Sequence, residues 1–212
     1  MIVQPIHSYT DRVVVIDYGM SNLQSVCNAL NALGCHAEVS SDPDIITSAD
    51  RIILPGVGAF GRGMSHLREM KLIAPLENSV AQGKPLLGIC LGMQLLADES
   101  FEHGHHEGLH FIPGSVRRLP ASPGIRIPHI GWNGVDHASH SELYREIKNQ
   151  SDYYFVHSYY FDVVDSRDAN GWCDYGGRFA ASVGRNKVYG VQFHPEKSHR
   201  AGLLLLRNFL LC

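Results

Sequence analysis

The stretch Lys84-Pro-Leu-Leu-Gly-Ile-Cys-Leu-Gly-Met-Gln94 joins an apolar run to a helical pattern at a single cysteine. Residues 85–89 form the apolar run, which predicts a buried strand. The leucines behind it recur at helical spacing, so a helix is expected to begin at once. Cys90 therefore lies at a tight strand-to-helix junction, with Gly88 and Gly92 two residues to either side.

This junction is typical of a nucleophile elbow, where glycines are needed because larger residues would clash in so tight a turn. At such a place the thiol of Cys90 faces the N-terminus of the following helix. The helix dipole and the free N–H groups there favour the thiolate, which is the nucleophilic form of cysteine. The alternative is a buried packing cysteine, because free cysteines are among the most buried residues.

Size and composition predict one domain over residues 1–212, with residues 1–11 as a flexible lead-in. The chain has 212 residues, of which 44% are hydrophobic and 18% are charged, which suffices for one well-buried core. The formal net charge is −3, which gives no electrostatic case for binding nucleic acid or an anionic membrane.

The cysteines predict a reduced, cytoplasmic protein. There are 5 of them, scattered and without Cys-x-x-Cys spacing, unlike a disulfide framework. Residues 1–10 lack the apolar segment of a signal peptide, and no stretch is long and apolar enough to span a membrane.

The first half of the chain alternates strand and helix patterns. Apolar strands are expected over 12–17, 36–40, 51–54 and 85–89, and helices over 23–33, 63–70 and 72–82, with a short one opening at Pro43. Ser21 is a candidate cap for the first helix. This order predicts an α/β fold with an open, doubly wound, mostly parallel sheet, in which ligands bind at the carboxyl ends of the strands. Cys90 and the glycine-rich segment 55–61 both lie at that edge.

The second half predicts an added antiparallel β portion. Residues 110–190 are rich in aromatic and β-branched residues and in turn signals. We expect strands near 115–118, 133–136, 153–155, 179–183 and 188–193, and helices over 142–148 and 202–211.

The last of these strands leads into a candidate base for the cysteine. In extended chain, side chains two residues apart point to the same side, so His194 can reach Cys90 while Glu196 orients the ring from behind. A surface His-Pro-Glu turn is the alternative. For an oxyanion, the Leu91 N–H and the backbone of Gly56, Val57 and Gly58 are candidate donors. This glycine loop lacks the Gly-Lys-Ser/Thr ending of a phosphate loop.

A metal site is not expected. The histidines at 103, 105, 106 and 110 match no ligand spacing of a helical or zinc-finger site, and no cysteine accompanies them. With Gly104 and Gly108 among them, they read as an exposed loop.

Two motifs resemble a known family. Gly88-Ile-Cys-Leu-Gly-Met-Gln94 together with Gly190-Val-Gln-Phe-His-Pro-Glu-Lys-Ser198 is similar to the class I, triad-type glutamine amidotransferases. Pro55-Gly-Val-Gly-Ala-Phe60, Pro128-His-Ile-Gly-Trp-Asn133 and Tyr154-Phe-Val-His-Ser-Tyr159 narrow the resemblance to glutaminase subunits of imidazole glycerol phosphate synthases. It covers the chain from about Val13 onward.

This resemblance implies glutamine hydrolysis without a cofactor, by Cys90 as nucleophile, His194 as proton shuttle and Glu196 as its orienting group. It implies that ammonia passes to a (β/α)8-barrel cyclase in a heterodimer that serves histidine biosynthesis. The matching positions for binding L-glutamine are Gln94, Glu102, Ser158 and Tyr159, and those facing the cyclase are Trp132 and Lys197. A core position for Trp132 remains an alternative.

The chain departs from the family pattern at Ser21, where glycine is expected, and in its extra N-terminal residues. Two other functions stay open. One is a related subunit that feeds ammonia to a different acceptor enzyme. The other is a cysteine hydrolase or redox-responsive binding module without glutamine chemistry.

Overall fold

A computed structural model describes residues 3–6, 9–121, 123–138 and 141–212 of the chain. Its centre is a parallel sheet of β1 (Val13–Ile16), β2 (Glu38–Ser40), β3 (Arg51–Gly56), β4 (Leu86–Cys90) and β13 (Val188–Val191). The strand order is β2-β1-β3-β4-β13-β12-β10-β7-β5-β6, which places the last strand of the chain directly beside β4. The predicted α/β fold with a mixed sheet is confirmed.

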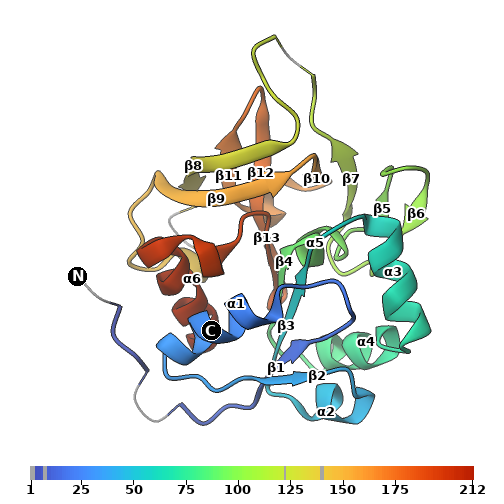
Figure 1. Ribbon diagram of the computed structural model, residues 1–212, viewed down its shortest axis with the longest axis vertical. Coiled ribbons are helices and arrows are strands. Elements are labelled where there is room, and N and C mark those ends of the chain that lie inside the picture. The colour runs from blue at the N-terminus through green and yellow to red at the C-terminus, as the bar shows by residue number, and fades with distance from the viewer. Residues whose placement is uncertain (1–2, 7–8, 122, 139–140) are drawn as a thin grey trace.

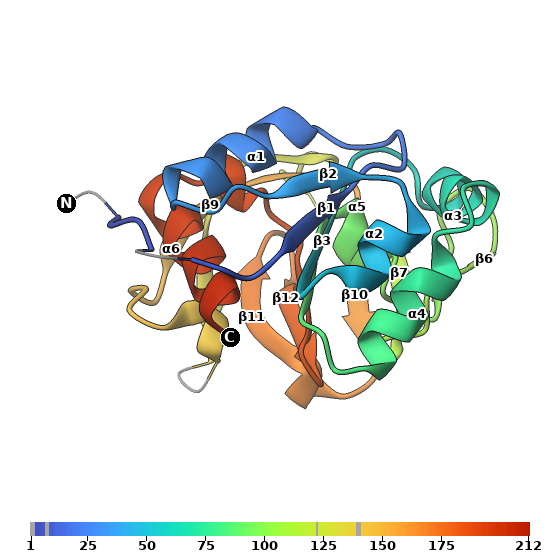
Figure 2. The same cartoon turned by 90° about the horizontal axis from the view of Figure 1, so that it is seen from below.

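Helices cover both faces of these parallel strands. Helices α1 (Leu23–Ala32) and α6 (His199–Leu211) lie on one face, and α2 (Pro43–Ser48), α3 (Phe60–Glu69) and α4 (Ile73–Ala81) lie on the other (Figures 1 and 2). Strand β1 shows why, since Val13 and Val15 belong to one buried cluster and Val14 and Ile16 to the other. A strand buried on both faces has to be apolar throughout, as this one is.

The antiparallel portion continues the sheet beyond β13, and its strand β9 (Ser151–His157) passes beside α6 (Figure 1). Its other strands are β5 (Glu99–Ser100), β6 (His106–Glu107), β7 (Gly114–Arg118), β8 (His129–His137), β10 (Tyr159–Val163), β11 (Ala169–Asp174) and β12 (Arg178–Arg185). Strand β12 pairs antiparallel with β13, so this portion is continuous with the parallel centre. Strands β8 and β9 pair with each other, with His129 opposite His157.

Two local predictions are wrong. The helix expected over 142–148 is only a 3-10 turn, Glu142–Tyr144, because Glu146 has a φ of 61° and breaks any helix there. Ser21 does not cap α1: the N-cap residue is Asn22, no side chain caps the helix, and the Ser21 hydroxyl is buried without a hydrogen-bond partner. The Asp42 cap of α2 is present, since its carboxylate accepts from the Asp44 N–H.

The described part of the predicted lead-in contacts the domain. Val3 is buried in the cluster beneath α1, and the Ile6 N–H donates to the Leu33 carbonyl at 2.8 Å. Among the described residues, no helix combines the length and the apolar character that crossing a membrane requires.

Candidate active site

Cys90 occupies a strained position at the end of β4. Its backbone has φ 54° and ψ −108°, and the short helix α5 (Leu91–Gln94) begins at the next residue. Residues other than glycine rarely adopt positive φ, and such strain persists where the surroundings enforce it, often at functional sites. The enforcing contact is close packing: a Cβ on Gly92 would lie 1.7 Å from the Leu54 carbonyl oxygen. The predicted elbow is therefore present.

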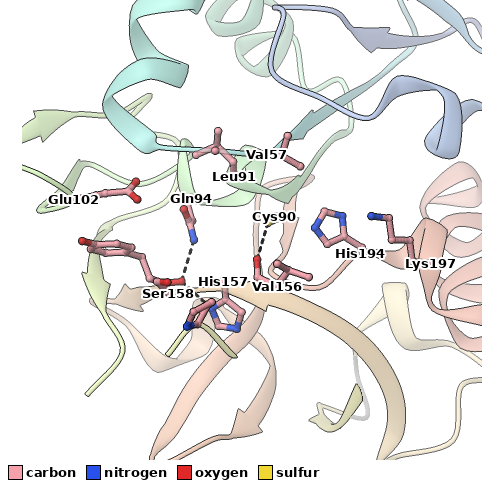
Figure 3. Close-up of a pocket in the computed structure, with 13 residues that line it drawn as sticks. Val57, Cys90, Leu91, Gln94, Glu102, Val156, His157, Ser158, His194 and Lys197 are labelled. Carbon is pink, nitrogen blue, oxygen red and sulfur yellow. Dashed lines mark hydrogen bonds between the residues drawn. The ribbon is translucent and has the colours of Figure 1, made fainter. Parts of the chain in front are cut away.

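A cavity of about 320 Å³ opens beside this elbow. Its walls include Cys90 and His194, and Figure 3 shows the imidazole of His194 next to the cysteine, with Gln94 on the other side. The other lining residues are Val57, Gly58, Leu91, Gln94, Glu102, Pro128, Val156, His157, Ser158, Tyr159 and Lys197. The sequence-predicted residues from the glycine loop, the elbow and the His-Pro-Glu segment thus meet at one cavity.

Glu196 lies behind His194, as predicted from their spacing. The Glu196 Oε1 atom is 2.8 Å from His194 Nδ1, and the exposed fractions of the two side chains are 2% and 6%. Burial lowers the pKa of His194, but hydrogen bonds to Cys90 and Glu196 outweigh it and raise the pKa to about 10. The ring is therefore held in its protonated form, with Nδ1 donating to the glutamate.

The glycine loop does not aim its central N–H at the cavity. The Val57 N–H donates instead to the Met20 carbonyl at 2.7 Å. Gly56 ends β3 and lies opposite Cys90 in the sheet, while Gly58 has a φ of 107°, which glycine tolerates. The loop is thus beside the nucleophile, but its Val57 donor is occupied.

The four residues predicted to bind glutamine all line the cavity, and two of them hold their polar groups through hydrogen bonds within the protein. The Glu102 carboxylate accepts from the Phe60 N–H at 2.6 Å, at the first turn of α3. The Tyr159 carbonyl accepts from Gln94 Nε2 at 3.0 Å, and Ser158 lies next to it at the cavity wall.

The two predicted interface residues differ in position. Lys197 lines the cavity, whereas Trp132 lies outside it on β8 and is 47% exposed, so the core alternative for this tryptophan is wrong. The indole of Trp132 stacks on the His199 ring at 4.7 Å.

Sequence reasoning missed four residues that touch the cavity or the thiol, one of which is Pro128 at the cavity wall. Val156 and His157 line the cavity, and Cys90 Sγ lies 3.9 Å from the Val156 carbonyl oxygen. Gln192 Nε2 is 3.7 Å from Cys90 Sγ. The sequence did hold a signal for Gln192: it is a polar residue next to the end of the largely apolar strand expected over 188–193.

Outside the cavity, histidines of the 103–110 segment pair with carboxylates. His105 Nε2 is 2.7 Å from Glu99 and His110 Nδ1 is 3.2 Å from Asp98.

Comparison with known proteins assigns the family. The family model for glutamine amidotransferase class-I matches residues 14–212. The imidazole glycerol phosphate synthase subunit HisH of Moorella thermoacetica is 49% identical over 197 residues, which cover 93% of this chain and 93% of that protein. The protein of the same name from Aquifex aeolicus is 47% identical over 93% of this chain and 95% of its own length.

The chain belongs to the HisH family of class-I glutamine amidotransferases. Solved amidotransferase structures share its fold. A crystal structure of a glutamine amidotransferase has a TM-score of 0.73 at 20% identity and covers 93% of this chain and 97% of its own. A glutamine amidotransferase from Thermotoga maritima has a TM-score of 0.63 at 18% identity, covering 96% and 83%.

Proposed function

We propose that the chain is the glutaminase subunit of an imidazole glycerol phosphate synthase. It hydrolyses L-glutamine to glutamate and ammonia and passes the ammonia to a (β/α)8-barrel cyclase subunit in histidine biosynthesis. The observation that carries the proposal is the buried His194–Glu196 pair beside the strained Cys90, in a chain related to HisH subunits over 93% of its length.

The chemistry assigned to the triad is acyl transfer through a thioester. The Cys90 thiolate attacks the side-chain carbonyl carbon of glutamine, and His194 gives its proton to the leaving nitrogen, which departs as ammonia. His194 then takes a proton from water as the water attacks the thioester. Glutamate leaves and the thiolate returns. Glu196 keeps the ring oriented and stabilises its charge throughout.

Both attacks place negative charge on the former carbonyl oxygen. The Leu91 N–H at the start of α5 is one assigned donor. A second comes from the loop of Gly56, Val57 and Gly58 once a peptide there turns. The bond from the Val57 N–H to the Met20 carbonyl supports a resting state in which this second donor is withheld.

Substrate binding is assigned to the far wall of the cavity. The Glu102 carboxylate is assigned to the α-ammonium group of glutamine, because the two groups have opposite charges and can form a charge-assisted hydrogen bond. Gln94, Ser158 and Tyr159 supply neutral polar groups around it. Small-molecule cavities of this kind hold a ligand by a few fixed polar groups.

The cyclase is assigned to the face around the cavity mouth. Three large apolar side chains on β8 and β9 are exposed there, Ile130 at 59%, Trp132 at 47% and Val156 at 37%. Exposed tryptophan and aliphatic groups are typical of an interface, and Lys197 adds a charge at the cavity wall.

The test is a reaction with the cyclase, its nucleotide ligand and glutamine labelled with ¹⁵N in the side-chain amide. We expect glutamate and imidazole glycerol phosphate in equal amounts. The label should enter the imidazole even with unlabelled ammonium in solution, because ammonia is passed inside the complex. Glutamate release without product would favour a different acceptor enzyme, and no glutamate release would refute glutaminase activity.

A further inference from the structure

Strand register puts a buried carboxamide beside the nucleophile. Strand β13 runs parallel to β4 with Val191 opposite Ile89, so the next residues along, Gln192 and Cys90, lie side by side. Gln192 is fully buried at 0% exposure, and its Nε2 lies 3.7 Å from Cys90 Sγ. A buried amide must satisfy its hydrogen bonds inside the protein, so its partners reveal its task.

One backbone carbonyl fixes the direction of every hydrogen bond in this group. The Tyr159 oxygen can only accept, so the Gln94 atom 3.0 Å away must be the Nε2 donor. The same Nε2 lies 3.0 Å from Gln192, which must present its Oε1 acceptor. The other end of the Gln192 amide, Nε2, is thereby turned to Cys90 as a donor. Flipping the Gln94 amide would set its oxygen against the Tyr159 oxygen, and flipping the Gln192 amide would set its nitrogen against the Gln94 nitrogen.

The carbonyl itself is held from its other side. His157 Nδ1 lies 2.8 Å from the Tyr159 oxygen and therefore donates to it, which leaves His157 Nε2 to accept from His129 Nδ1 at 3.0 Å. Burial lowers the pKa of His157 to about 3 and that of His129 to about 4, so both rings are neutral, as this pattern needs. The carbonyl has two lone pairs and both are used.

We propose that Gln192 is a positioning residue of the glutaminase reaction, which donates a hydrogen bond to the Cys90 sulfur and holds the amide of Gln94 in one orientation. This proposal rests on the proposed function. The donor stabilises a buried thiolate without occupying His194, and it weakens when the sulfur becomes an uncharged thioester. Since both N–H bonds of Gln94 are used by Gln192 and Tyr159, its Oε1 is the atom left for substrate. Gln94 therefore takes an N–H group of glutamine and not its carboxylate.

The direct test measures the thiolate without glutamine or cyclase. Iodoacetamide alkylation of Cys90 is followed against pH by peptide mass spectrometry in the 212-residue chain and in Gln192→Glu and Gln192→Met. Loss of a hydrogen bond to a charged group costs about 10- to 100-fold in equilibrium, so we expect the alkylation midpoint to rise by about one to two pH units. A carboxylate at position 192 also raises the midpoint by its charge, so the neutral Gln192→Met variant is the decisive one: a merely structural role would not move its midpoint.

Asn208→Leu is the matched control. This amide is also buried, but its hydrogen bonds go to the Leu143 and Arg145 carbonyls and not to Cys90. Its loss should lower the melting temperature and leave the Cys90 midpoint in place. An unmoved midpoint in folded Gln192→Met would overturn the proposal. Gln192→Glu has the shape of the native side chain, so an unmoved midpoint there would overturn it even if the methionine variant does not fold.

The kinetics of the complex separate the two parts of the proposal. Gln192→Glu keeps an acceptor for Gln94, so kcat should fall about 10- to 100-fold while KM for glutamine changes little. Gln192→Met removes the acceptor as well, so KM should rise too. Identical KM in both variants would remove the role in holding Gln94. A wild-type complex that does not hydrolyse glutamine would refute the proposed function, while the alkylation midpoints would still decide the contact to Cys90.

Discussion

At the scale of single residues, the proposed reaction depends on the sulfur of the strained Cys90 as its nucleophile. Its positive φ turns the side chain out of the sheet towards His194. Cys90→Ser should abolish glutamine hydrolysis, because a hydroxyl lacks the ionisation and polarisability of a thiol at the same place. The complex should still make imidazole glycerol phosphate from added ammonia. A serine variant that kept most of its glutamate release would contradict the assignment of the nucleophile.

The roles of His194 and Glu196 are unequal. His194→Ala should lose all measurable turnover, since the ring moves the protons, whereas Glu196→Gln should keep a small rate because the amide still orients the ring. Glutamate release by the two variant complexes, with circular dichroism to check folding, measures this. Equal and complete loss is compatible with a triad that acts as a unit, but an active His194→Ala variant is not.

The buried pair of His129 and His157 makes stability depend on pH. The folded-state pKa values of about 4 and about 3 are below the usual value of 6.5, so the unfolded chain binds more protons on acidification. The stability that this pair contributes is therefore full above pH 6.5 and falls as the pH drops towards 4. His129→Phe keeps a ring stacked on Tyr175 but cannot titrate. Between pH 6.5 and 5 its unfolding free energy should therefore fall less than that of the wild type, by up to about 2 kcal/mol. Urea unfolding at the two pH values measures this, and an equal loss in both proteins would contradict it.

At the scale of elements, the β4–α5 junction depends on close backbone contact. Gly92→Ala would force its Cβ into the Leu54 carbonyl, so we expect a loss of about 3 kcal/mol or more in unfolding free energy and a loss of activity. Gly63→Ala on α3 is the matched control, because its Cβ would lie 3.3 Å from the ends of two leucine side chains and not against backbone. That variant should stay within about 1 kcal/mol of the wild type. Equal effects in urea unfolding would show that the contact at Gly92 is not limiting.

The parallel half of the fold could be predicted because its elements carry local signals. The β4–α5 junction is one such signal, and so is the Asp42-Pro43 start of α2. The 3-10 turn at Glu142 was predicted as a helix because apolar spacing alone does not reveal a positive φ at Glu146. Strands β10 and β11 were both missed. Strand β10 pairs with β7, which is distant in sequence. Strand β11 pairs with the next strand, β12, but its Ala-Asn-Gly start lacks the residues typical of a strand.

In the candidate site, too, residues with local sequence signals were predicted, and contacts that depend on distant parts of the chain were not. Cys90, His194 and Glu196 carry sequence motifs, and the spacing of the last two already implied their contact. Gln192 lies within the 190–198 motif, but its contact with Cys90 follows only when the register of β13 against β4 is known. The bond that occupies the Val57 N–H was equally invisible, since it joins two loops through backbone atoms.

At the scale of the whole molecule, the resting loop predicts control by the partner. With the Val57 N–H bound to the Met20 carbonyl, the chain alone would lack one of the two proposed oxyanion donors, and such a loss costs about 100- to 1000-fold in rate. The isolated chain should be nearly silent towards glutamine, and the cyclase with its nucleotide ligand should activate it by turning a peptide in the loop. Glutamate release is compared for the chain alone, with the cyclase, and with the liganded cyclase. If the free chain is as fast as the liganded complex, the gating is refuted while the triad stands.

Because β13 lies between β4 and β12, the site can be complete only after the last strand of the chain has been synthesised. Strands β1 to β4 are synthesised first, and each of them pairs with another of the four. His194 follows β13, so the base arrives only after the antiparallel portion has been synthesised and the last strand has been inserted between its two neighbours. A prematurely ended chain would carry the proposed nucleophile without its proposed proton shuttle, so we expect it not to hydrolyse glutamine.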